Sequence, residues 1–363
     1  LVGSEMCIRD RINFSTVMED KEKKNVVSAG DNLTDYMETV IADLEKEGKF
    51  PAAHVYRSVL RSFTRFWNTP VSMRSDPTSV PNVLAPIQDV FTPERLKEYE
   101  TWLTECECSP NTISTYMRTL QAVYNRWMPP GMVNYNPILF KELYTKVESR
   151  TKRALTAGQM RQLETTEFCA LSLPQQRVLA CFMLMFMLRG MPFIDLAHLR
   201  KQNLQGRRIV YRRHKTGKLM MVDVPPDAFR LLQKYRNRAE SEYLFPILNE
   251  ASPGKERYHL YQDTLRRFNR ELARLMKKLL PGVSVSSYTA RHTWATLAYH
   301  SGTPLGLISQ SLGHSSIRVT MSYLKPFDAE VIDKVNRQVI ALVKGSKKKK
   351  VDSINMLYGT LLR

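Results

Sequence analysis

The sequence lacks the features of several common protein classes. Its longest apolar run, residues 178–188, is far shorter than the ~20 residues that a membrane-spanning helix needs. Its five cysteines are an odd number without paired C-x-x-C spacing, which argues against a disulfide framework and against a zinc site. Cys106 and Cys108 form a lone C-x-C pair, which we interpret as ordinary thiols of a reducing cytoplasm. No secretory signal is evident, so we expect a cytoplasmic protein without a membrane span.

The sequence also lacks two signatures of cofactor-dependent chemistry. No cluster of carboxylates indicates a magnesium site. No G-x-x-x-x-G-K-[ST] loop indicates a bound nucleoside triphosphate. We therefore expect the protein to work without a metal, ATP or any other cofactor.

Both ends of the chain lack a clear structural pattern. Residues 1–11 (LVGSEMCIRDR) contain no start methionine at position 1, and we interpret them as a cloning or sequence-assembly remnant, with a native arm as the alternative. Met18 is then a candidate start. Residues 1–30 as a whole are predicted to be flexible, and residues 346–363 to form a basic tail.

Positive charge is what the sequence has in excess. The formal net charge is +19 and the pI is about 9.7. Such an excess indicates a polyanionic partner, with nucleic acid first and an anionic membrane second. The chain has 363 residues, of which 43% are hydrophobic, so it has room for two domains with cores of their own.

Residues 31–130 are predicted to form a small all-α domain. Apolar residues recur at helical spacing in residues 33–44 and 52–67, and Thr92-Pro93 and Ser109-Pro110 are typical starts of two further helices. Arginines lie away from these apolar faces, where they either contact DNA phosphates or form a solvated surface. The arginines assigned to DNA contact are Arg57, Arg61, Arg65, Arg118 and Arg126.

After a predicted linker at residues 131–150, residues 151–345 are predicted to form a second domain. It is mostly helical, with a buried helix at residues 175–188. The fold class is therefore mainly α (α+β), because this domain also contains one small antiparallel sheet.

The sheet and a basic helix are the other features of the second domain. Residues 207–214 and 219–224 are rich in strand-forming residues and flank a K-T-G-K turn that carries Lys215. A helix at residues 261–280 exposes a strongly basic face, in which Arg266 and Arg270 are assigned to DNA contact.

Three residues with complementary chemistry lie in residues 288–323. Arg291, His314 and Tyr323 are predicted on three short helices, punctuated by glycines. A tyrosine hydroxyl is almost wholly protonated near neutral pH, so it needs nearby cations or a hydrogen-bond partner to become a nucleophile. Guanidinium groups suit the charge that builds on a phosphodiester under attack. The pattern points to phosphoryl transfer through a covalent tyrosine.

These motifs resemble those of the tyrosine recombinase (phage integrase) family, and most of all the integrases of bacterial conjugative transposons. The family's H-x-x-R-H-T box matches residues 288–293 (YTARHT), and its L-G-H box matches residues 312–314. Tyr323 follows His314 by nine residues, which is the family's usual spacing. The resemblance implies that residues 31–130 are a SAM-like core-binding domain and that residues 151–345 are the catalytic domain.

Two positions depart from the family pattern. The first arginine box places an arginine three residues before an acidic residue, but that position, counted back from Asp195, is Pro192. Arg189 lies one turn earlier and is our candidate for supplying the guanidinium, with Arg200 or a purely structural salt bridge as competitors. Tyr288 stands where the family has histidine. A phenol is a poor base near neutral pH, so Tyr288 is expected to donate a hydrogen bond instead.

The resemblance also implies roles for the site residues. Tyr323 would form a 3′-phosphotyrosyl link to DNA and release a 5′-hydroxyl, without ATP. Lys215, at the tip of the hairpin, would donate the proton that the leaving oxygen needs. The reaction would integrate or excise a mobile element. Two other functions stay open: DNA relaxation of the type IB topoisomerase kind, and DNA binding by a chain that has lost catalysis, which the proline at position 192 motivates.

Assembly on DNA is implied in the same way. The expected partner is double-stranded DNA with attachment sites, bound by a homotetramer that is monomeric when free, with DNA-bending proteins as possible accessories. Residues 328–343 predict an amphipathic helix. By the resemblance it would dock on the next protomer, and docking within its own chain is the alternative.

Overall fold

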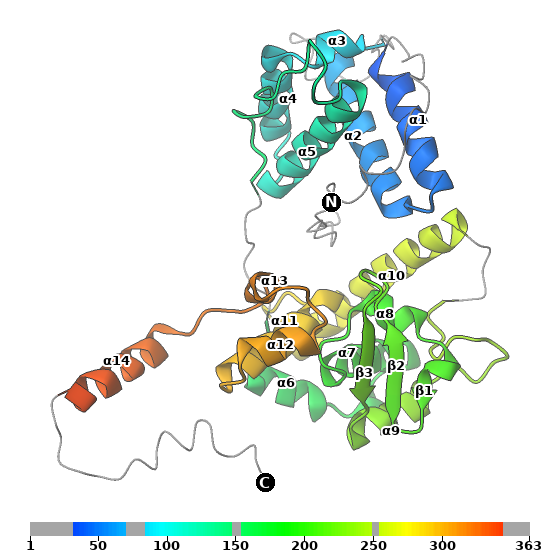
Figure 1. Cartoon of the computed structure of the whole chain (residues 1–363). Coiled ribbons are helices and arrows are strands. Elements are labelled where there is room, and N and C mark those ends of the chain that lie inside the picture. The colour runs from blue at the N-terminus through cyan, green and yellow to red at the C-terminus, as the bar shows by residue number, and fades with distance from the viewer. Residues whose placement is uncertain (1–31, 70–83, 147–153, 249–253, 344–363) are drawn as a thin grey trace. The chain divides into compact units, whose positions relative to one another are not determined.

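The computed structural model describes residues 32–69, 84–146, 154–248 and 254–343. They form two compact units, which we call unit 1 (residues 32–146) and unit 2 (residues 154–343); Figure 1 shows their elements. The segments predicted at the ends of the chain, residues 1–30 and 346–363, lie outside the described residues.

Unit 1 consists of helices joined by turns. Its helices are α1 (Leu33–Lys46), α2 (Phe50–Asn68), α3 (Ile87–Val90), α4 (Pro93–Glu105) and α5 (Pro110–Trp127). Side-chain oxygens of Asn32, Thr92 and Ser109 accept hydrogen bonds from the first turns of α1, α4 and α5, which satisfies backbone N–H groups that a helix start leaves open. The helix starts predicted at Thr92-Pro93 and Ser109-Pro110 are confirmed.

The core of unit 1 extends beyond its helices. Met37, Tyr99 and Met117 are completely buried between them. Leu139 and Phe140, in the chain after α5, are buried against the same core. Part of the predicted linker thus packs on unit 1. Turns carry these apolar side chains, so no helical or strand period reveals them in the sequence.

Unit 2 is mainly helical with one three-stranded antiparallel sheet of order β1-β2-β3, so the predicted fold class is confirmed. Its helices are α6 (Ala157–Glu164), α7 (Leu173–Met187), α8 (Phe193–His198), α9 (Pro226–Tyr235), α10 (Lys255–Leu279), α11 (Ser287–His300), α12 (Leu305–Ser311), α13 (Ile317–Met321) and α14 (Ala329–Val343). Its strands are β1 (Leu204–Gln205), β2 (Arg208–Arg212) and β3 (Leu219–Asp223), and short 3-10 turns lie at Phe168–Ala170 and Lys201–Asn203.

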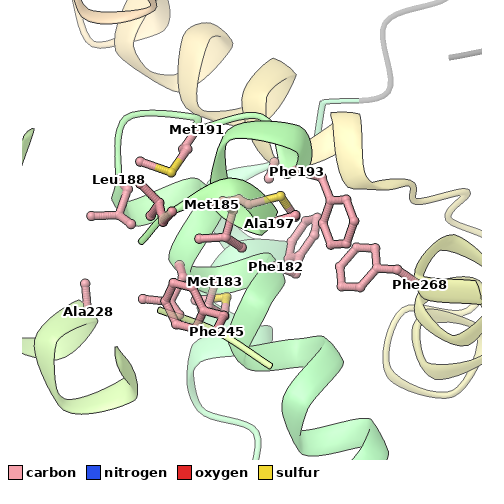
Figure 2. Close-up of a cluster of buried hydrophobic side chains, with 14 of the residues drawn as sticks. Phe182, Met183, Met185, Leu188, Met191, Phe193, Ala197, Ala228, Phe245 and Phe268 are labelled. Atoms are coloured by element: carbon pink, nitrogen blue, oxygen red, sulfur yellow. The ribbon is translucent and has the colours of Figure 1, made fainter. Parts of the chain in front are cut away.

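Helix α7 is the centre of unit 2, and α9, α10 and α11 pack around it. Its side chains Leu179, Phe182 and Met185 are completely buried, as expected for a helix that is apolar on all sides. Figure 2 shows Phe182, Met185 and neighbouring side chains of this cluster, including Phe193 and Phe268. Helix α7 contacts α11 directly, so the chain at the C-terminal end of α7 can contact side chains of α11.

The predicted β-hairpin is confirmed, with Tyr211 opposite Met220 in an antiparallel pairing of β2 and β3. Side chains alternate along both strands, so Tyr211 and Met220 face the core while Met221 is exposed. Two-residue strand β1 was not predicted, because so short a segment carries no alternation.

Two further features bear on function. Within the described ranges, no helix is long and apolar enough to cross a membrane.

Helix α14 buries none of its residues, although valine, isoleucine and leucine recur along it. The exposed ones are Val331, Ile332, Val335, Val339, Ile340, Leu342 and Val343.

Candidate active site

The site is built around the buried guanidinium of Arg291, which lies in the second turn of α11. The residue is only 2% exposed. Its Nη1 donates to the carbonyl oxygen of Gly190 at 2.8 Å, and its Nη2 donates to that of Leu312 at 2.6 Å. Burial lowers the pKa of Arg291, as expected for a cation taken out of water. These two carbonyls fix the orientation of the guanidinium.

Two glycines allow the backbone to approach this group closely. Gly190 follows α7 with φ of +64°, and a Cβ built there would lie 3.0 Å from the Cα of Arg291. Gly313 has φ of +66°, and its Cβ would lie 2.9 Å from Cδ of Arg213 and 2.8 Å from Sδ of Met220. Any larger residue would be strained at both positions and would push the site apart.

A second buried guanidinium, which the sequence analysis did not assign to the site, belongs to Arg213. It follows β2 directly and is 7% exposed. Its Nη1 donates to the carbonyl oxygens of Leu312 and Gly313, both at 3.1 Å. Arg213 and Arg291 therefore share the Leu312 carbonyl as an acceptor. The signal in the sequence is an arginine at a strand end, on the core-facing side of an alternating strand.

The buried charges of this region do not balance. In the described part of unit 2, the buried charged side chains are Arg213, Arg291 and Asp195. Asp195 Oδ2 lies 3.5 Å from Nε of Arg213, and its Oδ1 accepts a hydrogen bond from the His214 backbone at 2.8 Å. Burial raises the pKa of Asp195, against the opposing effects of these two contacts. Two guanidinium groups beside one carboxylate form a site for an anion.

His314 joins this group through both ring nitrogens. Its Nε2 lies 2.9 Å from Nη2 of Arg291, and its Nδ1 lies 2.9 Å from Oγ1 of Thr320. An arginine can only donate, so Nε2 is the acceptor, and the protonated Nδ1 donates a hydrogen bond to Oγ1 of Thr320. Burial, and then the charges of Arg291 and Arg213, lower the pKa of His314 to about 3. The imidazole is therefore neutral at pH 7.

Tyr323 lies beside these residues, but not on a helix. The prediction that a short helix carries it was wrong, because α13 ends at Met321 and Ser322 caps it. The ring of Tyr323 stacks on that of His314 with 4.8 Å between centroids, and the Arg291 guanidinium lies 5.3 Å from the ring centre. Its hydroxyl shares a hydrogen bond of 2.8 Å with the hydroxyl of Tyr288.

The other predicted catalytic residues differ in where the structure places them. Tyr288 faces Tyr323, and its hydrogen bond is with the hydroxyl group of that tyrosine. Lys215 lies in the exposed turn between β2 and β3, and its charge contributes to the lowered pKa of His314. Arg189 has φ of +60° after α7, and its Nη1 donates to the Met221 carbonyl of β3 at 3.4 Å.

The arginines assigned to DNA contact lie on helices of both units. Arg61, Arg65 and Arg126 are exposed, and Arg118 Nε donates to the Ser114 carbonyl within its own helix. Arg57 forms a 2.6 Å ion pair with Glu45. Arg266 pairs with Asp263 at 2.8 Å, and Arg270 lies 3.8 Å from Glu271.

Helix α10 carries the densest basic surface of unit 2. Eight of its residues are lysine or arginine and three are acidic. Within the described residues, no group of three or more His, Cys, Asp or Glu side chains is arranged to hold a metal ion.

The sequence profile of the Phage integrase family matches residues 153–330, and that of the Phage integrase SAM-like domain matches residues 32–144. The chain belongs to the phage integrase family and is a tyrosine-type site-specific recombinase. No curated protein matches the sequence significantly.

Solved structures share the fold at low sequence identity. The XerH site-specific recombinase bound to difH substrate is 15% identical, with 84% of this chain and 83% of that chain covered and a TM-score of 0.54. The Tn1549 transposon integrase in complex with a circular intermediate DNA is 16% identical, with 85% and 100% covered and a TM-score of 0.53. A lambda integrase dimer bound to a COC′ core site is 15% identical, with 80% and 77% covered and a TM-score of 0.55.

The environment of His314 predicts how it titrates. Its pKa of about 3 in the folded chain lies below the ~6.5 of an unfolded histidine, so its contribution to stability is present above about pH 6.5 and is lost as the pH falls towards 3. Imidazole nitrogen NMR should report a neutral, Nδ1-protonated ring from about pH 8 to about pH 5. Thr320→Val removes the acceptor of the Nδ1–H group but should leave this tautomer in place, because Arg291 still donates to Nε2. A titration midpoint near ~6.5 in the native protein would contradict the geometry.

Proposed function

We propose that Tyr323 is the nucleophile that cuts one DNA strand, and that the excess of buried positive charge beside it binds the scissile phosphate. The Tyr323 oxygen attacks phosphorus, the bond to the 5′-oxygen breaks, and the DNA keeps a 3′-phosphotyrosyl link. A 5′-hydroxyl from a partner strand reverses the step. The bond energy stays in the phosphotyrosine, so strand joining needs no ATP.

The observation that carries this proposal is the pair of guanidinium groups on one carbonyl. Arg291 and Arg213 both reach Leu312 from different elements, and Tyr323 lies against Arg291. Charge builds on the nonbridging oxygens as the phosphorus is attacked, and donors held in place beforehand stabilise it without reorganising. We assign to Arg213 the role that the sequence analysis gave to Arg189.

The remaining residues supply positioning and proton transfer. The hydrogen bond with Tyr288 orients the Tyr323 hydroxyl, and the neutral ring of His314 holds Arg291 until phosphate arrives. Lys215, in the turn that directly follows Arg213, is our candidate for the donor that protonates the leaving 5′-oxygen.

DNA is bound through basic helices of both units. The net charge of +19 and the basic face of α10 support contact with the phosphate backbone, which positions the protein without reading sequence. The SAM-like match to unit 1 supports contact of that unit with double-stranded DNA as well. Similarity to a transposon integrase supports integration or excision of a mobile element in the cytoplasm.

Assembly on DNA is the last part of the proposal. Helix α14 buries none of its residues, and its apolar side chains include Val335 and Val339, one turn apart and both 52% exposed. We assign this surface to docking on a neighbouring protomer, which gives a homotetramer on paired attachment sites and a monomer when free. DNA-bending accessory proteins would help to bring the sites together.

The nucleophile is tested with a nicked suicide substrate. Cleavage releases a short fragment that carries the new 5′-hydroxyl, and this fragment diffuses away. The native protein should form a covalent DNA adduct that survives denaturation, and Tyr323→Phe should form none while still binding DNA. Binding without any adduct in the native protein would leave a DNA-binding protein that has lost catalysis. Relaxation of supercoiled DNA without two-site recombination would favour the topoisomerase alternative.

The assignment of Arg213 is tested against Arg189. Arg213→Lys keeps the charge but loses the planar guanidinium, whose Nη1 donates to two carbonyls while its Nε lies beside Asp195, so adduct formation should slow by about 10²-fold or more. Arg189→Lys is the matched control and should stay within about threefold, because the half-buried Arg189 loses a single long, solvent-exposed hydrogen bond. The reverse ranking in a single-turnover cleavage assay would return the role to Arg189.

The assignment of α14 is tested by charge. Val335→Asp with Val339→Asp places two carboxylates on the apolar surface, so assembly of several protomers on paired sites should be lost while one protomer still binds one site. Asn336→Asp with Gln338→Asp adds the same charge to the same helix and should assemble normally. Light scattering and gel shifts on DNA with one and two sites distinguish the outcomes. Normal assembly of the valine variant would overturn the docking role.

A further inference from the structure

One stripe of α11 holds the backbone that carries the proposed nucleophile. His292, Thr296 and His300 are spaced four residues apart, so they lie along one side of the helix. His292 Nδ1 lies 3.0 Å from the Tyr323 carbonyl oxygen, and His300 Nε2 lies 3.1 Å from the Lys325 carbonyl oxygen. A carbonyl can only accept, so both rings donate.

Thr296 is the middle member of the stripe and makes two hydrogen bonds with the same backbone segment. Its hydroxyl donates to the Tyr323 carbonyl at 3.4 Å and accepts from the Lys325 backbone N–H at 3.1 Å. The residue is 3% exposed. A hydroxyl that donates to one residue and accepts from another fixes the spacing of both along the helix.

Aromatic contacts close both ends of this stripe. The ring of His292 packs on that of Tyr323, with 4.9 Å between centroids. At the far end, Phe327 stacks on His300 at 4.5 Å and packs on Tyr299 at 4.8 Å. The segment from Tyr323 to Phe327 is thus attached along its length to one helix.

The attachment matters because no helix of its own supports Tyr323. Helix α13 ends two residues earlier and α14 begins at Ala329, so the segment between them is irregular. Helix α11 also carries Arg291, one residue before His292. The helix that presents the phosphate-binding guanidinium therefore also sets the position of the tyrosine.

We infer that His292, Thr296 and His300 are positioning residues that set the Tyr323 hydroxyl against the phosphate bound at Arg291. This inference rests on the proposed function of Tyr323. The three residues are expected to affect the cleavage step and not the rejoining step. Before cleavage, the tyrosine is placed by these contacts; after cleavage, the covalent bond to phosphorus holds it in place by itself. Loss of the stripe should therefore slow cleavage far more than rejoining.

Thr296→Val tests this, because valine has the shape of threonine but neither donates nor accepts. Single-turnover cleavage of the suicide substrate at saturating DNA should slow by about tenfold or more, since small misplacements of reacting atoms reduce rates steeply. Rejoining, started by adding a 5′-hydroxyl strand to the isolated adduct, should stay within about threefold of the native rate. Thr296→Ser restores the hydroxyl and should recover most of the cleavage rate.

The outcomes separate the inference from the proposed function. Equal slowing of cleavage and rejoining by Thr296→Val, or no slowing at all, would overturn the positioning role while the adduct itself upholds Tyr323 as nucleophile. Absence of any adduct in the native protein would overturn the proposed function and the positioning role with it. His300→Ala, which removes the outer contacts with Lys325 and Phe327, should show the same asymmetry to a smaller extent. DNA affinity and melting temperature, measured for each variant, verify that the chain is folded and bound.

Discussion

The carbonyl oxygen of Leu312 accepts hydrogen bonds from two buried guanidinium groups, and the whole site depends on this shared acceptor. Arg291 approaches from α11 and Arg213 from the end of β2, so one backbone group holds a helix and a hairpin together. Two like charges in a poorly polarisable interior repel strongly, and one carboxylate compensates only part of that repulsion. Carbonyl dipoles supply the remainder in this structure. Under the proposed function a bound phosphate would be the counter-charge, and binding and catalysis would both depend on this excess of positive charge.

Close packing converts this electrostatic requirement into geometry. Gly190 lets the end of α7 touch the backbone of Arg291, and Gly313 lets the turn before His314 lie against Arg213. Helix α7 can serve as the fixed reference because the side chains of its C-terminal half, residues 179–185, are mostly buried in the core of unit 2. The cations are consequently held by backbone groups of a rigid core, which is the arrangement that gives preorganised donors.

The tyrosine is held differently from the cations. It lies on an irregular segment, attached to α11 by side chains that contact main-chain atoms of Tyr323 and Lys325. Such a segment can be released by breaking a few hydrogen bonds, whereas the cation site can change only if the core repacks. A fixed phosphate site with a separately attached nucleophile suits a reaction in which the tyrosine bonds to DNA and leaves it again.

The sequence by itself determined the mainly helical fold, the hairpin, several helix starts and the identity of Arg291, His314 and Tyr323 as one motif. These follow from local rules: apolar periodicity, capping side chains and fixed spacing along the chain. Only the tertiary structure shows that Arg213 shares the Leu312 carbonyl with Arg291, that Tyr323 lies beyond α13, and that Thr296 contacts its backbone. The arginine contacts join residues that lie 21 to 101 positions apart in the sequence. Tertiary packing selects such partners, and no local pattern in the sequence reveals them.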